Sequence, residues 1–269
     1  MDKKTALVTG ACINTGVAIV ERLAREGYNV FFTGRSEASV REKEREYRER
    51  FPDVEIVGYV LNSLLDEITV DERAVEEMFS DIDSRGVFVE TLVLNAADQG
   101  LSQKIFENPL TDFMKVINTN VVWNYCICEY AAKRMKENGG GNIIFINSNT
   151  AYRAIPDRIA YVASKGGQLG LMRALALDLG KYNIRVNAVL PGMTATEAVE
   201  KNLTEEFRNL FLRHIPLGRI GLPEEISEAV CYFASDASAY TTGQILTVSG
   251  GFGLATPVYG DLANKDNRR

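Results

Sequence analysis

Seven short apolar runs alternate with segments of helical periodicity along nearly the whole chain. The runs are rich in valine, isoleucine, leucine and phenylalanine, as is typical of strands that are buried on both faces. Strands that alternate with helices predict right-handed βαβ units and a parallel sheet. We therefore expect a single α/β domain with a seven-stranded parallel sheet that is covered by helices on both faces.

The expected strands are residues 5–9, 29–33, 54–61, 92–95, 142–147, 185–190 and 244–248. The expected helices are residues 17–25, 36–50, 71–81, 110–136, 161–179, 205–213 and 223–234. No repeat, low-complexity segment or linker divides the chain, so residues 1–251 are predicted to form one domain. Residues 252–269 show neither helical nor strand periodicity and are predicted to be a C-terminal tail.

The composition narrows the classes of protein that fit. The chain of 269 residues is 46% hydrophobic and 25% charged, which suits one sizeable core. A net charge of −6 gives no basic surface for nucleic acid. No run approaches the roughly 18 apolar residues of a membrane helix, so we expect no membrane partner. The start, MDKKTALVTG, leads directly into a strand pattern, and we expect no signal peptide.

The cysteines and the histidine limit the possible chemistry further. Four cysteines are present and none forms a Cys-x-x-Cys pair, so we interpret them as reduced thiols of a cytoplasmic protein. His214 is the sole histidine. A multi-histidine metal site is therefore excluded, a histidine-based catalytic triad is disfavoured, and we predict no metal.

A glycine-containing turn, Gly10–Gly16 (GACINTG), joins the first expected strand to the first expected helix. Such a turn presents backbone N–H groups and a helix N-terminus to a pyrophosphate. Glycines permit this approach because a side chain would block it. Asn14 holds the place of the middle glycine, and asparagine tolerates a positive φ better than most residues. We predict a dinucleotide phosphate site at Gly10, Ile13, Asn14, Thr15 and Gly16, against the alternative of an ordinary turn.

An arginine follows the second expected strand. A site for NAD(H) normally has Asp or Glu here, about 20 residues past the glycines, to bind the ribose 2′-hydroxyl. This chain has Gly34 and then Arg35, and a guanidinium suits a 2′-phosphate. Glu37 weakens the argument slightly, and an ordinary surface arginine is the alternative. We expect NADP(H) as the cofactor, with NAD(H) less favoured.

The apolar run at residues 142–147 ends at Ser148, and Tyr161 and Lys165 follow in a helix-forming segment. Positions four apart share one face of a helix, so the Lys165 ammonium can lie near the Tyr161 phenol. A free phenol has a pKa of about 10, and a nearby cation lowers it, which makes Tyr161 usable as a general acid or base. Ser148 can hydrogen-bond the oxygen on which Tyr161 acts. Taken alone, Tyr-x-x-x-Lys is more often an ordinary surface pair.

Together these motifs resemble the short-chain dehydrogenase/reductase family in its single-domain form. The resemblance covers nearly everything from Lys4 to Gly251. The matching pieces stand in the family order: Thr9–Gly16, Leu94–Ala97, Asn120, Ser148, Tyr161, Lys165, Pro191–Gly192 with Thr194 and Thr196 beyond, and Ser249–Gly251. The spacings from Asn120 to Ser148 and from Ser148 to Tyr161 both fit the family. The separation of Tyr161 from Lys165 is shorter than in the enoyl-reductase branch.

The resemblance implies a Rossmann-like, doubly wound fold and an oxidoreductase that transfers a hydride between NADP(H) and a small-molecule carbonyl or secondary alcohol. Tyr161 would exchange a proton with the substrate oxygen, while Lys165 lowers its pKa and holds the nicotinamide ribose. Ser148 would position the carbonyl. The side chain of Asn120 would hold a water that links Lys165 to solvent, with a plain helix asparagine as the alternative.

The resemblance also implies cofactor contacts beyond the first turn. They are Arg35, Asn62, Asn95, Ala96, Tyr161, Lys165, Pro191, Gly192 and Thr194. Asn62 stands where the family often has an aspartate that contacts adenine, and its amide oxygen can accept the same hydrogen bond. For Thr194, a plain loop threonine is nearly as well supported.

Three departures from the family pattern lie in the cofactor half. Asn14 and Ala97 replace glycines, and Leu94 replaces an asparagine. They bear on cofactor affinity more than on the chemistry. Two alternative functions stay open: a catalytically silent NADP-binding sensor or scaffold, and a lyase or epimerase on the same fold.

The substrate and the assembly are less constrained. Tyr152, Ile155, Pro156, Met193 and residues 196–216 are expected to line the substrate pocket, but they name no substrate. The helices at residues 110–136 and 161–179 are more apolar than one sheet face can cover. Relatives of this type pair these helices, so we expect a homodimer or homotetramer. The tail either orders against a neighbouring subunit or has no fixed structure.

Overall fold

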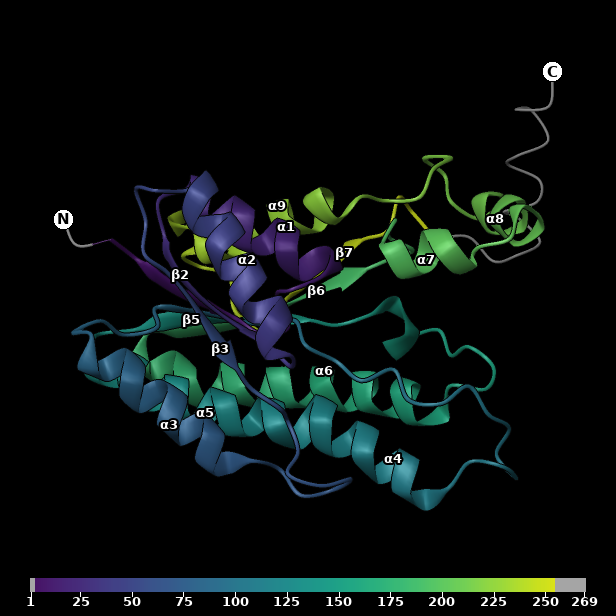
Figure 1. Cartoon of the computed structure of the whole chain (residues 1–269). Helices are drawn as coiled ribbons and strands as arrows, with labels where there is room; N and C mark the ends of the chain where they lie inside the picture. Colours follow the sequence, from purple (N-terminus) through teal and green to yellow (C-terminus); the bar gives the residue numbers. More distant parts are fainter. Residues whose placement is uncertain (1–2, 255–269) are drawn as a thin grey trace.

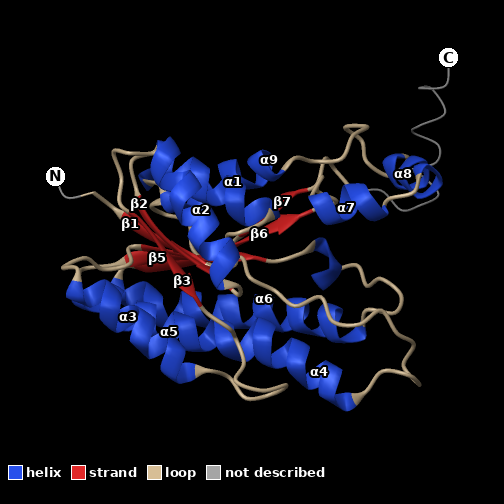
Figure 2. Cartoon of the chain, in the orientation of Figure 1, coloured by secondary structure: helices blue, strands red, loops and turns tan. Residues whose placement is uncertain are grey.

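The computed structural model describes residues 3–254 of the chain. Its centre is a seven-stranded parallel sheet in the order β3-β2-β1-β4-β5-β6-β7. Figure 2 shows this sheet as one layer between two layers of helices. The strands are β1 (Thr5–Val8), β2 (Asn29–Gly34), β3 (Ile56–Val60), β4 (Thr91–Leu94), β5 (Gly141–Ile146), β6 (Ile184–Pro191) and β7 (Ile245–Val248). The predicted Rossmann-like, doubly wound fold is confirmed.

Helices cover both faces of the sheet (Figure 1). One face carries α1 (Asn14–Arg25), α2 (Glu37–Arg50) and α9 (Pro223–Ala234). The other carries α3 (Glu72–Ser84), α4 (Leu110–Ile117), α5 (Trp123–Glu137) and α6 (Ile159–Leu179). Two short helices, α7 (Glu197–Asn202) and α8 (Glu205–Leu212), lie beyond the carboxyl ends of β6 and β7. No helix in residues 3–254 is long and apolar enough to cross a membrane.

The strands form because their side chains are buried on both sides. All four residues of β1 and of β4 are buried. Successive side chains on a strand point to opposite faces, so Leu7 and Phe31 join the core under α3, α5 and α6. Val8 and Phe32 join the core under α1, α2 and α9. Each strand therefore contributes side chains to both cores. For this reason its sequence is a continuous apolar run and does not alternate between apolar and polar residues.

The strand order creates the position for a site. The chain runs from β1 outward to β2 and β3, and then returns to place β4 on the other side of β1. The connections after β1 and β4 therefore diverge and leave a crevice at the carboxyl ends of the strands. Ligands of open α/β sheets bind at such a point.

Three helices differ from the sequence-based expectation. Helix α1 begins at Asn14, so the last three residues of the predicted turn belong to the first helical turn. The expected helix at residues 110–136 is interrupted by a π-helical turn at Asn118–Val122. Helix α7 was not predicted, because six residues are too few to show a helical period; Thr196 caps it by accepting a hydrogen bond from the Val199 N–H at 3.3 Å.

Candidate active site

A cleft of about 1390 Å³ opens at the carboxyl ends of the strands. Its walls come from the connections after β1 to β6 and from the segment that contains α7 and α8. Ser148, Tyr161, Lys165 and every predicted cofactor residue line it. Asn120 does not line the cleft and lies behind it. The sequence motifs indicated these residues separately. The topology brings them together from six different loops.

The turn after β1 has the shape of a phosphate cradle. Gly10 has a φ of +65°, and a Cβ there would lie 2.9 Å from the Ala96 Cα. A Cβ on Gly16 would lie 2.7 Å from the Ala11 Cα, so backbone atoms fill the space a side chain would need. Asn14 adopts a φ of +53°, as its type permits. The N-terminus of α1 has no side-chain cap, which suits an anion at its free N–H groups.

Side chains behind the cradle fix it to the neighbouring strand. The Thr9 hydroxyl accepts hydrogen bonds from the Asn95 and Ala96 N–H groups, each at 3.0 Å. The Asn95 amide donates in return to the carbonyls of Thr9 and Gly10 at 3.0 and 2.9 Å. Asn95 and Ala96 therefore hold the edge of the crevice between β1 and β4. The sequence motif contained Thr9 but did not indicate this bridging role.

The end of β2 leaves an arginine free at the cleft. A Cβ on Gly34 would lie 2.7 Å from Val40, so a larger residue does not fit there. The next side chain, Arg35, is exposed and lines the cleft. Among residues 3–254 no hydrogen bond or ion pair engages its guanidinium. Asp66 lines the same region, but its carboxylate accepts hydrogen bonds from the N–H groups of Ile68 and Thr69, both at 2.7 Å.

Lys165 is buried beneath the cleft floor. Its side chain lies on α6 with the residue only 2% exposed, and its Nζ donates a hydrogen bond to the Ile146 carbonyl at 3.0 Å. The same Nζ lies 5.6 Å from the centroid of the Tyr161 ring, which confirms that the two residues share a helix face. Burial lowers the pKa of Lys165 to about 7.

The pKa of Tyr161 moves opposite to the expectation. Burial raises it, while the Ser148 hydroxyl and the positive charge of Arg158 act against that rise. The prediction that Lys165 lowers the pKa of Tyr161 is therefore wrong in this structure. The reason is that the phenolate loses more hydration on burial than its neighbours restore. Tyr161 consequently keeps its proton at neutral pH.

Ser148 is held by the end of β5. Its N–H donates to the Asn147 side-chain oxygen at 2.7 Å. Its hydroxyl oxygen accepts a hydrogen bond from the Thr150 N–H at 3.2 Å. The hydroxyl hydrogen of Ser148 is then directed to Tyr161, whose pKa this hydrogen bond lowers.

The Asn120 side chain joins two walls of the site. Its amide accepts from the Asp98 N–H at 2.7 Å and donates to the Asp98 carbonyl at 2.8 Å and to the Ser164 hydroxyl at 2.9 Å. It lies in the π-helical turn, where the Asn120 carbonyl accepts from the side chains of Asn124 and Gln168 at 2.9 and 2.7 Å. Turns of this kind are frequent at functional sites. The water implied at Asn120 stays a prediction.

Sequence reasoning missed a buried amide network. The Asn147 amide donates to the Lys165 carbonyl at 2.9 Å and to the Gln168 side-chain oxygen at 3.1 Å. Gln168 in turn bonds Asn120. These contacts fix α6 against β5 and against the π-helical turn. The available signal was a glutamine three residues after Lys165 in an apolar helix, together with an asparagine at the end of an apolar strand.

The predicted substrate pocket is partly correct. Ile155 and Met193 line the cleft, whereas Tyr152 and Pro156 do not. The prediction for these two is wrong, because their loop turns them away; the Tyr152 hydroxyl accepts a hydrogen bond from Arg173 at 3.2 Å. The segment at residues 196–216 contributes the lining residues Thr196, Val199, Leu203, Thr204, Phe207 and Phe211.

The first residues of the predicted tail also reach the cleft. Phe252 lines it and stacks on Phe211, with the ring centroids 4.5 Å apart. Pro257 and Tyr259, for which contacts with a neighbouring subunit were expected, lie outside the described residues.

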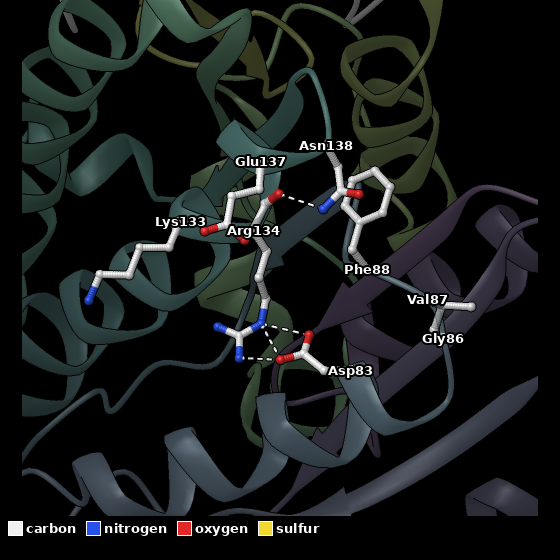
Figure 3. Close-up of a pocket in the computed structure, with 8 residues that line it drawn as sticks. All are labelled: Asp83, Gly86, Val87, Phe88, Lys133, Arg134, Glu137 and Asn138. Carbon is white, nitrogen blue, oxygen red and sulfur yellow. Dashed lines mark hydrogen bonds and ion pairs between the residues drawn. The ribbon is translucent and has the colours of Figure 1, made fainter.

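A second, smaller cavity of about 440 Å³ lies at the amino-terminal ends of β4 and β5 (Figure 3). Arg134 faces Asp83 there, with its Nε 2.8 Å from one carboxylate oxygen, and Lys133 pairs with Glu129 at 2.7 Å. None of the predicted site residues lies in it. Within residues 3–254, no group of three or more His, Cys, Asp or Glu side chains is placed to hold a metal ion.

Comparisons with known proteins agree with this geometry. The family model described as enoyl-(acyl carrier protein) reductase matches residues 10–253. The 7alpha-hydroxysteroid dehydrogenase of Clostridium sardiniense is 35% identical over 265 residues, which are 97% of each chain. The 3-oxoacyl-acyl-carrier-protein reductase FabG of Chlamydia trachomatis is 31% identical over 260 residues, covering 92% of this chain and 96% of the relative.

A solved structure is similar over nearly the same span. It is a 7 alpha-hydroxysteroid dehydrogenase complexed with NADH and 7-oxo glycochenodeoxycholic acid, with a TM-score of 0.85 and 30% identity over 93% of this chain and 94% of that chain. Fold and site together define an oxidoreductase of the nicotinamide-dependent class that acts on hydroxyl and carbonyl groups. The chain belongs to the short-chain dehydrogenase/reductase family.

Proposed function

We propose that this protein transfers a hydride between NADP(H) and a ketone or secondary alcohol, with Tyr161 as the general acid and base. The observation that carries the proposal is one cleft that holds both halves of such a site. A glycine cradle lies at its β1 and β2 end, and Ser148, Tyr161 and Lys165 lie at its β5 end. A bound nicotinamide cofactor would supply or accept the hydride.

The protein's own residues handle the proton and the orientation. Because burial raises the pKa of Tyr161, its hydroxyl is a proton donor at neutral pH and can protonate a substrate oxygen during reduction. Ser148, whose hydroxyl hydrogen-bonds Tyr161 in the absence of substrate, would donate to that oxygen and position it. Lys165, with a pKa near 7, can take up or release a proton near neutral pH and so return the proton that Tyr161 gives. The contact of Lys165 with Ile146 holds the ammonium under the ring.

The preference for NADP(H) rests on the end of β2. Arg35 is exposed at the cleft and unpaired within the described part of the chain, and Gly34 stands where an acidic residue would favour NAD(H). A guanidinium presents several N–H donors in the geometry that a phosphate accepts. Asn62 also lines the cleft, which supports its proposed contact with adenine.

The test measures consumption of reduced nicotinamide with NADPH and with NADH over a panel of ketones that includes an oxo-steroid and a 3-oxoacyl thioester. We expect NADPH to be preferred. Arg35→Ala should weaken NADPH binding about ten-fold or more, since it removes charge-assisted hydrogen bonds, and should leave NADH binding nearly unchanged. Arg73→Ala is the matched control, because Arg73 is exposed on α3, away from the cleft.

Equal losses for the two cofactors in Arg35→Ala, or a wild-type preference for NADH, would refute the assignment to NADP(H). If no ketone or alcohol on the panel changes the nicotinamide absorbance, the sensor or lyase alternatives take the place of the oxidoreductase.

We also propose a cytoplasmic homodimer or homotetramer in which residues 1–251 form the catalytic unit. The four cysteines are all free thiols, as a reducing compartment favours. Helices α5 and α6 expose apolar side chains, among them Tyr125 at 48% and Leu177 at 83% of their surface. An isologous pairing of these helices would cover that surface.

A further inference from the structure

The β5 end of the cleft has an apolar wall. Phe211 lies between two other rings, 6.1 Å from the centroid of Phe207 and 4.5 Å from that of Phe252. All three residues line the cleft, together with Val199, Leu203, Met193 and Ile155. Such a wall removes apolar surface of a ligand from water. It therefore fits a bulky apolar substrate better than a small polar one.

Within residues 3–254, one unpaired cation lines this apolar end of the cleft. Six charged side chains line the cleft: Arg35, Asp66, Asp98, Lys115, Arg153 and Lys165. The first two lie at the β2 and β3 end, Asp98 and Lys115 pair with each other at 3.7 Å, and Lys165 is buried. Arg153 remains, and no acidic side chain in residues 3–254 pairs with it.

The backbone holds Arg153 in place without using its charge. Its guanidinium donates a hydrogen bond to the Gly253 carbonyl. Gly253 has a φ of +82°, a conformation that favours glycine. The contact ties the residue after Phe252 to the loop after β5. Of the five N–H donors of the arginine, one is used in this contact.

A buried hydroxyl also lacks a protein partner at this end. Thr150 lines the cleft and is 8% exposed, and its Oγ1 has no hydrogen-bond partner within the described structure. Buried polar groups in native proteins are normally satisfied. The Thr150 hydroxyl therefore offers a hydrogen-bond partner to a polar group of a ligand in the cleft.

We propose that the substrate is a bulky apolar ketone or alcohol that carries an anionic group, and that Arg153 binds this group. The inference rests on the proposed function, because it assigns the substrate of that site. The reacting oxygen lies at Ser148 and Tyr161, the apolar body lies against the phenylalanine wall, and the anionic group pairs with the remaining donors of Arg153. A planar guanidinium binds a carboxylate through two parallel hydrogen bonds.

The probe is loxoprofen, an aryl cyclopentanone with a carboxylate at the far end of the molecule, and the comparison compound is its neutral methyl ester. Steady-state kinetics with the full-length protein and NADPH give KM and kcat for each, and calorimetry without turnover gives the two dissociation constants. The variants are Arg153→Gln, which keeps a donor for Gly253, and Arg153→Lys, which keeps the charge. Arg208→Gln is the matched control, since Arg208 is exposed on α8 but does not line the cleft.

We expect the wild type to bind the acid more tightly than the ester. Arg153→Gln should raise KM and the dissociation constant for the acid about ten-fold, with kcat and the ester nearly unchanged. Arg153→Lys should restore part of the preference, and Arg208→Gln should behave as the wild type. Added salt should weaken binding of the acid alone.

The two proposals fail in different ways. The assignment of an anionic substrate is overturned by any of three results, even if ketones are reduced. The acid and the ester bind equally, neither binds, or Arg153→Gln affects both equally. Tighter binding of the acid that Arg153→Gln abolishes supports the assignment even if neither compound is turned over. The oxidoreductase proposal fails separately, when no ketone or alcohol on the panel changes the nicotinamide absorbance.

Discussion

Tyr161 and Lys165 show how burial, more than spacing, decides what a side chain does. Their separation in the sequence places them on one helix face, as predicted. The surroundings then move the pKa of Lys165 down to about 7 and the pKa of Tyr161 up. The directions of these shifts depend on how deeply the fold buries the two side chains. The sequence therefore predicts that Tyr161 and Lys165 lie together, but it does not predict the protonation state of either side chain.

The lowered pKa of Lys165 predicts a pH-dependent contribution to stability. The unfolded lysine binds a proton below about pH 10.5, whereas the folded one does so only below about pH 7. Between these values the unfolded state binds more protons, so the contribution of Lys165 to the free energy of unfolding rises with pH by about 1.4 kcal/mol per unit. Below about pH 7 it is constant and unfavourable.

The measurement compares urea unfolding of the wild type and of Lys165→Met between about pH 7 and pH 9. We expect the free energy of unfolding of the wild type, minus that of the variant, to increase as the pH rises. The raised pKa values of the cysteines affect both proteins equally and cancel in the difference. A difference that stays constant across this range would show that Lys165 keeps its ordinary pKa.

Among the elements, those with a strong local period were predictable and the short or irregular ones were not. Helix α9 and the seven strands lie within two residues of the expectation, because their patterns repeat over several turns or alternate without a break. Helix α7 and the π-helical turn were missed. The Asn120 carbonyl in this turn accepts from Asn124, four residues further along the same helical run, and from Gln168, which reaches it only after α6 packs against the turn.

A substitution of Gly16 tests whether the turn after β1 binds the phosphates of the cofactor. In Gly16→Ala the added methyl group would meet the backbone of Gly10 and Ala11, so the turn must shift at a cost of about 1–3 kcal/mol. We expect weaker NADPH binding and a lower melting temperature. In the control Gly180→Ala, the methyl group meets nothing within 4 Å, and both quantities should stay near the wild type. Unchanged NADPH affinity in Gly16→Ala would place the phosphates elsewhere.

At the scale of the whole molecule, the single chain leaves apolar surface on two neighbouring helices. Much of the apolar surface of residues 110–136 is buried within the monomer, including Trp123 and Ile127, which the sequence alone did not separate from the exposed part. Val122 in the π-helical turn, Tyr125 on α5 and Leu177 on α6 stay exposed. Which apolar side chains are buried and which stay exposed depends on how α5 packs between α3 and α6. No sequence pattern shows this packing.

We expect light scattering at micromolar concentration to give two or four times the chain mass of 29.8 kDa. Tyr125→Glu combined with Leu177→Glu should lower that mass, because charges at an apolar contact lose hydration without a partner. Glu substitution of Tyr232, which is exposed on α9 on the opposite face of the sheet, serves as the control. A monomer mass for the wild type would refute the proposed assembly.

The role of Tyr161 is the centre of this account, and Tyr161→Phe tests it most directly. The variant removes the hydroxyl and keeps the ring against Lys165, so NADPH should bind with nearly wild-type affinity. Ketone reduction should fall by about 100-fold to 10,000-fold, the usual contribution of a positioned proton donor. Both are measured on one preparation, by calorimetric titration with NADPH and by loss of the reduced-nicotinamide absorbance. A Tyr161→Phe variant that reduces ketones at the wild-type rate would show that Tyr161 is structural and would contradict the proposed mechanism.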